Sequence, residues 1–242
     1  MVDGNPASSV FTTCRFDETG KVLALNHHFD RLMNASKQVN NPVPDPTLLS
    51  EILMKSIKEF GKKEGLARLS WSSTGEASCE TRSLNHPNSP LVAITHPAPE
   101  WPRRFRGIKH GNWEPYMAAG ELARESGADI SLLVADHAIV DADRATPLIL
   151  DENGWAYSPG PEQGGIASVT ISLISKHLES NGIPFRMAYL TEEMIRRCKE
   201  FVVVGTGIGV LPIGEIDGID IPLGNCLIDI ISEALKIAWN ES

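Results

Sequence analysis

The sequence contains the segment Arg106-Gly107-Ile108-Lys109-His110-Gly111-Asn112-Trp113, which holds a single lysine between glycine-marked turns. Proline-rich sequence precedes this segment at residues 95–102, and a helix-like run follows it. A lone lysine is most often a solvated surface charge. Lys109 therefore becomes a candidate for chemistry only through other motifs along the chain, which are considered outward from it.

The composition predicts a globular protein that binds neither nucleic acid nor a membrane. Of 242 residues, 42% are hydrophobic and 22% are charged, which suits one large domain or two small ones. The net charge is −9 and basic residues form no stripe, so nucleic acid is not expected as a partner. No apolar run resembles a signal peptide or a membrane span. Four scattered cysteines without a CxxC motif predict reduced thiols, a cytoplasmic protein and no metal site.

The first 95 residues mix strands with amphipathic helices, which is the pattern of an α+β lobe. A hairpin is predicted from strands at residues 10–16 and 21–25 across a turn at 17–20. Asn26 is then expected to cap a helix over residues 27–37. The remaining predictions are a helix that Asp45 caps and Pro46 begins, and strands over residues 66–72, 77–83 and 91–95.

The second half alternates short apolar strands with helices and contains two glycine-rich turns, at residues 164–168 and 205–209. Glycines before a helix leave backbone N–H groups that can cradle an anion. Either turn could equally be a tight turn without a ligand, since neither matches a dinucleotide fingerprint or a Walker motif. A helix is also predicted over residues 115–126. Its expected buried residues are Met117, Ala118, Leu122 and Ala123.

His28 and Arg31 lie three residues apart, so they share one face of the first predicted helix. The plain interpretation is a solvated polar face. The functional interpretation directs the Arg31 guanidinium at an anion, because its planar fork matches the oxygens of a phosphate.

Taken in order, these motifs resemble the class IV aminotransferase family, the fold-type IV group of pyridoxal-phosphate enzymes. This group includes branched-chain and D-amino acid aminotransferases and aminodeoxychorismate lyase. The resemblance extends from Phe11 to Gly218. The matching segments are Phe11-Thr12-Thr13-Cys14-Arg15 with Gly20-Lys21, His28-Phe29-Asp30-Arg31-Leu32 against H-x-x-R-L, Arg68-Leu69, Lys109-His110-Gly111-Asn112 against K-x-x-N, Gly165-Ile166, and Gly205-Thr206 through Pro212 with Asp217-Gly218.

The resemblance implies an α/β fold of the α+β type with two lobes, and a homodimer. The small N-terminal α+β lobe is expected over residues 1–95 and an interdomain linker over residues 96–105. A larger C-terminal lobe that binds pyridoxal phosphate on a β-barrel-like sheet is expected over residues 106–242.

The resemblance also implies roles for individual residues. Lys109 would be the catalytic residue, forming a Schiff base with pyridoxal 5′-phosphate and then transferring the proton. The phosphate would be held by Arg31, by the backbone N–H groups of Ile166 and Ala167, and by Thr206.

Asp141 lies 32 residues after Lys109, where the family has a glutamate that faces the pyridine nitrogen. A carboxylate at that position keeps the ring protonated, and the protonated ring is an electron sink.

Three departures from the family pattern bear on catalysis. The family's E-x-S-x-S-N reads Asp141-Ala142-Asp143-Arg144-Ala145-Thr146 here, and Ala167-Ser168 replace a Thr-Arg pair. The sequence ahead of residue 10 also lacks the strand and the D-R-G segment that precede the family's opening strand. Backbone N–H groups can hold a phosphate whatever side chains they carry, so the ring-nitrogen contact is the part that these changes affect most.

The opening Phe11-Thr12-Thr13 is similar to that of aminodeoxychorismate lyases, whereas aminotransferases more often carry a glutamate there. The favoured function is therefore a lyase that releases pyruvate and 4-aminobenzoate from an aminodeoxychorismate-like substrate. One alternative is a branched-chain or D-amino acid aminotransferase that uses an amino acid and a 2-oxo acid. The other is a family member that keeps the fold and catalyses neither reaction, which the altered residues 141–146 would explain.

Overall fold

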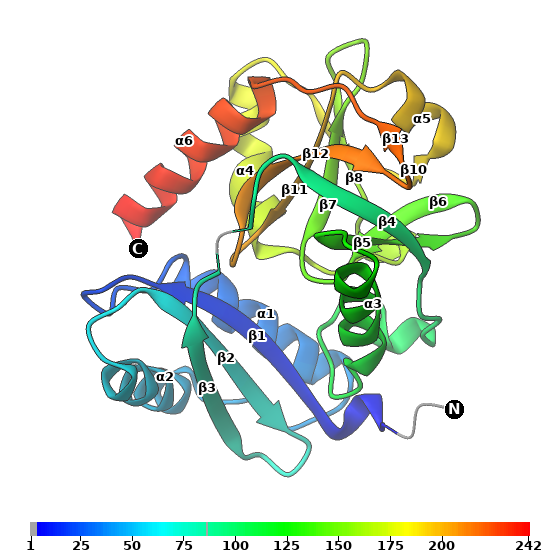
Figure 1. Ribbon diagram of the computed structural model, residues 1–242. Coiled ribbons are helices and arrows are strands. Elements are labelled where there is room, and N and C mark those ends of the chain that lie inside the picture. The colour runs from blue at the N-terminus through cyan, green and yellow to red at the C-terminus, as the bar shows by residue number, and fades with distance from the viewer. Residues whose placement is uncertain (1–3, 86) are drawn as a thin grey trace. The chain divides into compact units, whose positions relative to one another are not determined.

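The computed structural model describes residues 4–85 and 87–242, and the chain divides into two compact units (Figure 1). The first unit comprises Met1–Asn85, Trp101–Trp113 and Ile237–Ser242, and the second comprises His86–Glu100 and Glu114–Lys236. The sequence-based division placed Lys109 at the start of the C-terminal lobe. By its contacts, the segment around Lys109 belongs with the N-terminal residues instead.

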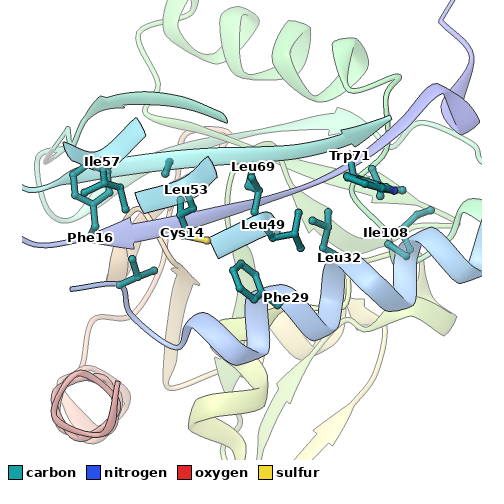
Figure 2. Packing of buried hydrophobic residues seen from close by; sticks show 14 of the residues in the cluster. Cys14, Phe16, Phe29, Leu32, Leu49, Leu53, Ile57, Leu69, Trp71 and Ile108 are labelled. Carbon is teal, nitrogen blue, oxygen red and sulfur yellow. The ribbon is translucent and has the colours of Figure 1, made fainter. Parts of the chain in front are cut away.

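A three-stranded antiparallel sheet forms the centre of the first unit, in the order β1 (Ser9–Phe16), β2 (Gly65–Ser72), β3 (Ala77–Ser83). Two helices, α1 (Leu25–Gln38) and α2 (Pro46–Phe60), cover one face of this sheet. Figure 2 shows Phe29 and Leu32 of α1 with Leu49 and Leu53 of α2, all directed into one apolar core. Two single-turn helices complete the unit, Pro6–Ser8 and Arg103–Phe105.

The start of α2 follows its prediction, and the region before α1 does not. Asp45 caps α2 by accepting a hydrogen bond from the Thr47 N–H at 2.8 Å. The predicted strand over residues 21–25 is wrong, because Val22 makes only a single bridge to Phe16. The chain then turns at Ala24, whose φ of 50° directs it into α1. Ala24 is thus the N-cap, and the prediction that Asn26 caps the helix is wrong.

The second unit is built on one curled sheet with the pairing order β10-β6-β5-β4-β12-β11-β7-β8-β9, to which β13 adds beside β12. Strands β6 and β7 are consecutive in the chain and contact each other, although four strands separate them in the pairing order. Such a contact requires the sheet to curl like part of a barrel, which confirms the expected β-barrel-like sheet. The strands are β4 (Leu91–Pro97), β5 (Ile130–Ala135), β6 (Ala138–Ala142), β7 (Thr146–Leu150), β8 (Ala156–Ser158), β9 (Phe185–Met187), β10 (Leu190–Thr191), β11 (Glu200–Gly205), β12 (Gly209–Ile216) and β13 (Ile219–Asp220).

Strand β11 is buried on both faces and separates the two apolar cores of the second unit. Its Phe201 and Val203 belong to the core that includes β4, β5 and β6. Its Val202 and Val204 face the other way, into a core shared with α4 (Val169–Ser180) and α6 (Cys226–Glu241). This unit also contains the single-turn helix Pro161–Gln163, the α-helix α5 (Glu192–Arg197) and helix α3 (Glu114–Glu125).

Helix α3 (Glu114–Glu125) lies where it was predicted but buries a different face. Of the four residues expected inside, only Ala123 is buried; Met117, Ala118 and Leu122 are exposed. The buried face consists of Tyr116 and small residues, and the Ser131 hydroxyl of β5 donates to the Ala119 carbonyl at 2.6 Å. Small residues allow this close approach, so their packing determines the buried face rather than the larger apolar side chains.

Across residues 4–85 and 87–242, no helix combines the length and the apolar character that crossing a membrane requires.

Candidate active site

Lys109 is held in the first unit by backbone pairing with β1. The Phe11 N–H donates to the Lys109 carbonyl at 2.9 Å, and His110 forms an antiparallel bridge with Val10. The Lys109 Nζ lies 4.4 Å from the centroid of the Trp113 ring and 5.5 Å from that of Phe11. These two rings meet edge to face, with centroids 5.2 Å apart. The lysine amine is therefore bordered by aromatic rings, which hold a cation in a defined position and limit its contact with water.

Arg31 is fixed from the neighbouring helix by a hydroxyl of β1. Its Nη2 donates to the Thr12 Oγ1 at 2.5 Å, and the same oxygen lies 2.8 Å from the His28 Nδ1. Thr12 and His28 are fully buried. Among the described residues, the Arg31 Nε is also buried and has no hydrogen-bond partner. Burial lowers the pKa of Arg31 to about 10, so the guanidinium remains protonated at neutral pH.

The pKa of His28 is affected by both Arg31 and Lys109, the two predicted cationic site residues of this unit. Burial lowers its pKa well below the usual value, and the positive charges of Arg31, His27 and Lys109 lower it further. Lys109 and Arg31 thus lie in one electrostatic neighbourhood, although 78 positions separate them in the sequence. His28 is neutral at physiological pH and adds no charge to that neighbourhood.

A second arginine borders the lysine from strand β2. The Arg68 guanidinium carbon lies 3.8 Å from the centroid of the Phe11 ring, the ring that also approaches Lys109. Burial lowers the pKa of Arg68, and the nearby Glu80 partly offsets this effect. The sequence indicated Arg68 as part of a motif, but it did not reveal that Phe11 and Trp113 surround the lysine amine. The alternation of side chains along β1 could have indicated the position of Phe11, because it places Phe11 on the face opposite to the core-facing Val10 and Cys14.

His110 lies in an aromatic enclosure directly after Lys109. Its ring centroid is 4.4 Å from that of Trp101, 5.8 Å from Phe105 and 5.9 Å from Trp113. Neither ring nitrogen has a hydrogen-bond partner among the described residues. Burial lowers the pKa of His110 to about 4, so the side chain is neutral at physiological pH. Its contacts fix the segment that carries the lysine.

Asp141 lies in the second unit, beside an irregularity in strand β6. Leu133 pairs with Asp141 and Val134 pairs with Ile139, so Val140 is an extra residue that forms a bulge. Because of the bulge, Ile139 and Ala142 both enter the sheet's apolar core. Asp141 is buried, and its Oδ1 accepts a hydrogen bond from the Ala142 N–H at 2.9 Å. Bulges commonly redirect a side chain at a functional site.

The first glycine turn packs against this bulge. A Cβ on Gly165 would lie 2.8 Å from the Val140 carbonyl oxygen, so only glycine fits there without a shift of the backbone. Ile166 and Ala167 follow directly, and Ser168 caps α4 by accepting from the Ile171 N–H at 3.4 Å. The turn is therefore fixed against the strand that carries Asp141.

The second glycine turn lies beside the connection from β6 to β7. Thr146 pairs with Val204 at the end of β11, and a Cβ on Gly205 would lie 3.6 Å from the Ala145 Cα. Thr206 follows in the turn between β11 and β12. This places the Thr206 turn next to residues 145 and 146, which continue the segment that begins at Asp141.

The predicted site residues thus form two groups. Lys109 and Arg31 lie together in the first unit, while Asp141, Ile166, Ala167 and Thr206 lie in the second, around the bulge and the start of β7. Within the described chain, no cluster of three His, Cys, Asp or Glu residues could hold a metal ion.

Comparison with known proteins assigns a family to this arrangement. The profile described as amino-transferase class IV matches residues 9–216. A protein of Methanocaldococcus jannaschii, provisionally named a branched-chain-amino-acid aminotransferase, is 21% identical over 217 residues, covering 82% of this chain and 75% of that protein.

Solved structures show the same fold. A Legionella pneumophila protein, provisionally named a 4-amino-4-deoxychorismate lyase, has a TM-score of 0.83 at 18% identity, with 96% of this chain and 91% of that chain covered. The branched-chain aminotransferase of Thermoproteus uzoniensis, solved with norvaline, has a TM-score of 0.84 at 19% identity, with 98% and 87% covered. At these identities, the structural similarity establishes the fold alone.

Proposed function

The chain belongs to the amino-transferase class IV family, and from that premise we propose that it is a lyase acting on an aminodeoxychorismate-like substrate. The family consists of enzymes that depend on pyridoxal phosphate, and one structural neighbour, from Mycobacterium tuberculosis, is a form with this cofactor bound. The chain is accordingly a pyridoxal-phosphate-dependent lyase or aminotransferase. The choice of lyase, its substrate and the roles of individual residues are our proposals.

The residues present fit the cofactor's chemistry. Lys109 supplies an amine beside two aromatic rings, and Arg31 presents a charged guanidinium whose Nε is buried without a partner among the described residues. Gly165 allows a backbone turn where any Cβ would collide. When bound, pyridoxal phosphate withdraws electrons from the substrate carbon that carries the amine.

In this proposal, the first unit supplies the reactive amine. Lys109 would hold the cofactor through its aldehyde, and its amine, once the substrate amine has displaced it, would accept the proton of the substrate carbon. The rings of Phe11 and Trp113 orient the amine and exclude water from it. Arg31 binds the cofactor's phosphate with its remaining N–H groups.

The second unit supplies a carboxylate and a backbone cradle. Asp141 would keep the pyridine nitrogen of the bound cofactor protonated, a role that its buried position beside the bulge supports. The N–H groups of Ile166 and Ala167, with Thr206, bind the phosphate. Replacement of the family's Thr-Arg pair by Ala167-Ser168 leaves these N–H groups in place.

The observation that carries the lyase proposal is the position of Phe11-Thr12-Thr13. This lyase-like sequence borders the proposed reactive lysine, because the Phe11 N–H donates to the Lys109 carbonyl at 2.9 Å. The aminotransferase alternative is favoured by the names of the relatives from M. jannaschii and T. uzoniensis. Both reactions use the same lysine, so the geometry around Lys109 serves either.

An assay with the purified protein separates these functions. Pyridoxal phosphate should give the visible absorbance band of the lysine-bound cofactor, and Lys109→Ala should abolish it. The protein should then release pyruvate from aminodeoxychorismate without any added 2-oxo acid. Amine transfer to 2-oxoglutarate without pyruvate release would favour the aminotransferase. Absence of cofactor uptake would contradict both activities and indicate a non-catalytic member of the family.

We further propose a cytoplasmic homodimer, which the family resemblance and the reduced cysteines suggest. Sedimentation of the purified protein tests the dimer, and a mass of 26.4 kDa, that of one chain, would contradict it.

A further inference from the structure

Thr12 lies at the centre of a buried polar chain that ends at Arg31. Its Oγ1 accepts a hydrogen bond from the Arg31 Nη2 at 2.5 Å and lies 2.8 Å from the His28 Nδ1. The structure records these two contacts, and no others, for the Thr12 hydroxyl among the described residues. Thr12 and His28 are fully buried, so water does not replace either partner.

The available donors fix the direction of one of these two hydrogen bonds. Arg31 can only donate, so the Thr12 oxygen accepts from it. The hydroxyl proton is then free to be donated to the His28 Nδ1. That direction places the imidazole proton on Nε2, giving a neutral His28. In the opposite tautomer Nδ1 would donate to the Thr12 oxygen and the hydroxyl proton would have no acceptor, whereas in the first it is the buried His28 Nε2–H that has no partner among the described residues. The contact between Thr12 and His28 is a hydrogen bond in either tautomer.

We propose that Thr12 and His28 are positioning residues that fix the Arg31 guanidinium in the orientation that binds the cofactor's phosphate. This inference rests on the proposed role of Arg31 as a phosphate ligand. An arginine side chain has many rotamers, and one anchored N–H removes much of that freedom before an anion binds. The Nη2 is used for anchoring, which leaves the Nε and Nη1 N–H groups for an anion.

The anchor uses side chains from two elements that pack in one core. Thr12 lies on β1 among residues that face the core, since Val10 and Cys14 on either side of it belong to the apolar cluster. His28 and Arg31 lie three residues apart on α1, so they meet the same Thr12 side chain. The orientation of Arg31 is therefore set by the packing of α1 on β1.

The test compares the affinities of pyridoxal phosphate and of pyridoxal, which lacks the phosphate. Thr12→Val keeps the shape of the side chain and removes its hydroxyl. We expect it to weaken pyridoxal phosphate binding by about tenfold and to leave pyridoxal binding within about twofold. Thr12→Ser restores the hydroxyl and should restore the preference for the phosphorylated compound. An equal loss for both compounds would show a merely structural role and would overturn the proposal.

His28 offers an independent pair of variants. His28→Asn places an amide oxygen near the position of Nδ1 and should keep the preference for pyridoxal phosphate. His28→Leu removes the acceptor and should reduce that preference as Thr12→Val does. Ser36→Ala serves as a matched control, because it removes another buried hydroxyl of α1, one that bonds to the Leu32 carbonyl at 2.9 Å. A loss of preference in Ser36→Ala equal to that in Thr12→Val would overturn the proposal.

Two further measurements separate this inference from the function on which it rests. Imidazole ¹⁵N NMR of the cofactor-free protein should show a neutral His28 whose Nδ1 signal shifts in Thr12→Val, and an unchanged Nδ1 signal in that variant would overturn the hydrogen-bond chain. Arg31→Ala should lose the preference for pyridoxal phosphate over pyridoxal. If Arg31→Ala retains it, the proposed phosphate role of Arg31 fails, whatever the NMR result shows.

Discussion

The first unit surrounds its predicted site residues with side chains, whereas the second holds its own on backbone turns around a bulged strand. Lys109 and Arg31 are positioned by aromatic rings, a hydroxyl and an imidazole. In the second unit, the turn that carries Ile166 and Ala167 is held because the Val140 carbonyl leaves no room for a Cβ at residue 165. Side-chain positioning needs particular residue types, while backbone positioning needs only small residues at particular places.

This difference bears on how much each departure from the family pattern should matter. The departures within the second unit fall at residues 141–146 and 167–168, where Asp141 is proposed to act through its carboxylate and Ala167 through its backbone N–H. In the first unit, the motif H-x-x-R-L and the lysine segment are intact, and their side chains contact one another or share a charge environment. We therefore expect the changes at Ala167 and Ser168 to affect binding little, because backbone N–H groups do not depend on the side chain. Asp141 is the exception, because its proposed role belongs to its carboxylate.

Removal of the lysine amine should have the largest effect. Lys109→Ala should lower turnover by about 10⁴-fold, because the variant loses both the nucleophile and the proton carrier. Lys63→Ala, at an exposed position, is the control and should retain full activity. The measurements are pyruvate release and the absorbance of the bound cofactor. Activity of Lys109→Ala within tenfold of the unaltered protein would show that the first unit does not supply the reactive amine.

The next largest effect should come from the one carboxylate on which the second unit depends. Asp141→Asn should lower turnover by about 10²-fold, because the neutral amide cannot hold the ring nitrogen protonated. Asp143→Asn is the matched control, since Asp143 is another buried acid, whose Oδ1 accepts from the Ser131 N–H at 3.3 Å. Equal losses in the two variants would indicate general destabilisation and would remove Asp141 from the proposed site.

Acid should destabilise the first unit through its buried histidines. Burial lowers the pKa of folded His110 from an ordinary 6.5 to about 4. The unfolded state therefore binds a proton that the folded state does not, so this contribution to stability is complete above pH 6.5 and is lost as the pH falls toward 4. The free energy of unfolding should drop by about 3 kcal/mol over that range.

Urea unfolding at pH 7 and at pH 4.5 measures this effect. His110→Phe keeps an aromatic ring in the enclosure of Trp101, Phe105 and Trp113 and removes the titrating group. Its free energy of unfolding should therefore depend less steeply on pH than that of the unaltered protein. An unchanged slope would show that His110 does not carry the acid sensitivity.

The sequence predicted the fold best where periodicity reflects burial. The strands over residues 66–72 and 77–83, and the helix that begins at Pro46, lie where the pattern placed them. The hairpin failed at Ala24, where a single residue with φ of 50° ends the extended run, and composition does not encode that angle. The buried face of α3 was misjudged because close packing selected its small residues over Met117 and Leu122.

In the candidate site, too, residues in sequence motifs could be predicted, whereas contacts that depend on packing could not. Lys109 and Arg31 could be proposed from the sequence because their residue types carry chemistry and occur in recognisable motifs. The environment of the amine was missed, because its contacts with Phe11 and Trp113 depend on how distant segments pack. Near Asp141, the bulge depends on the register between β5 and β6, which one strand's sequence does not specify.

The two glycine turns of the second unit provide the smallest and sharpest test. A Cβ on Gly165 would lie 2.8 Å from the Val140 carbonyl oxygen, so Gly165→Ala must displace the backbone beside the bulge. It should destabilise the protein by about 2 kcal/mol and weaken pyridoxal phosphate binding. A Cβ on Gly205 would make an ordinary contact, 3.6 Å from the Ala145 Cα, so Gly205→Ala should change stability by less than about 0.5 kcal/mol.

Thermal unfolding and cofactor titration of both variants measure the contrast between the turns. If the second unit binds through backbone geometry, then affinity for pyridoxal phosphate should fall in Gly165→Ala and remain in Gly205→Ala. A small effect in both variants would mean that the backbone beside the bulge can shift without consequence for the phosphate. In that case the second unit would depend on side chains as the first does, and the changes at Ala167 and Ser168 would then weaken phosphate binding directly.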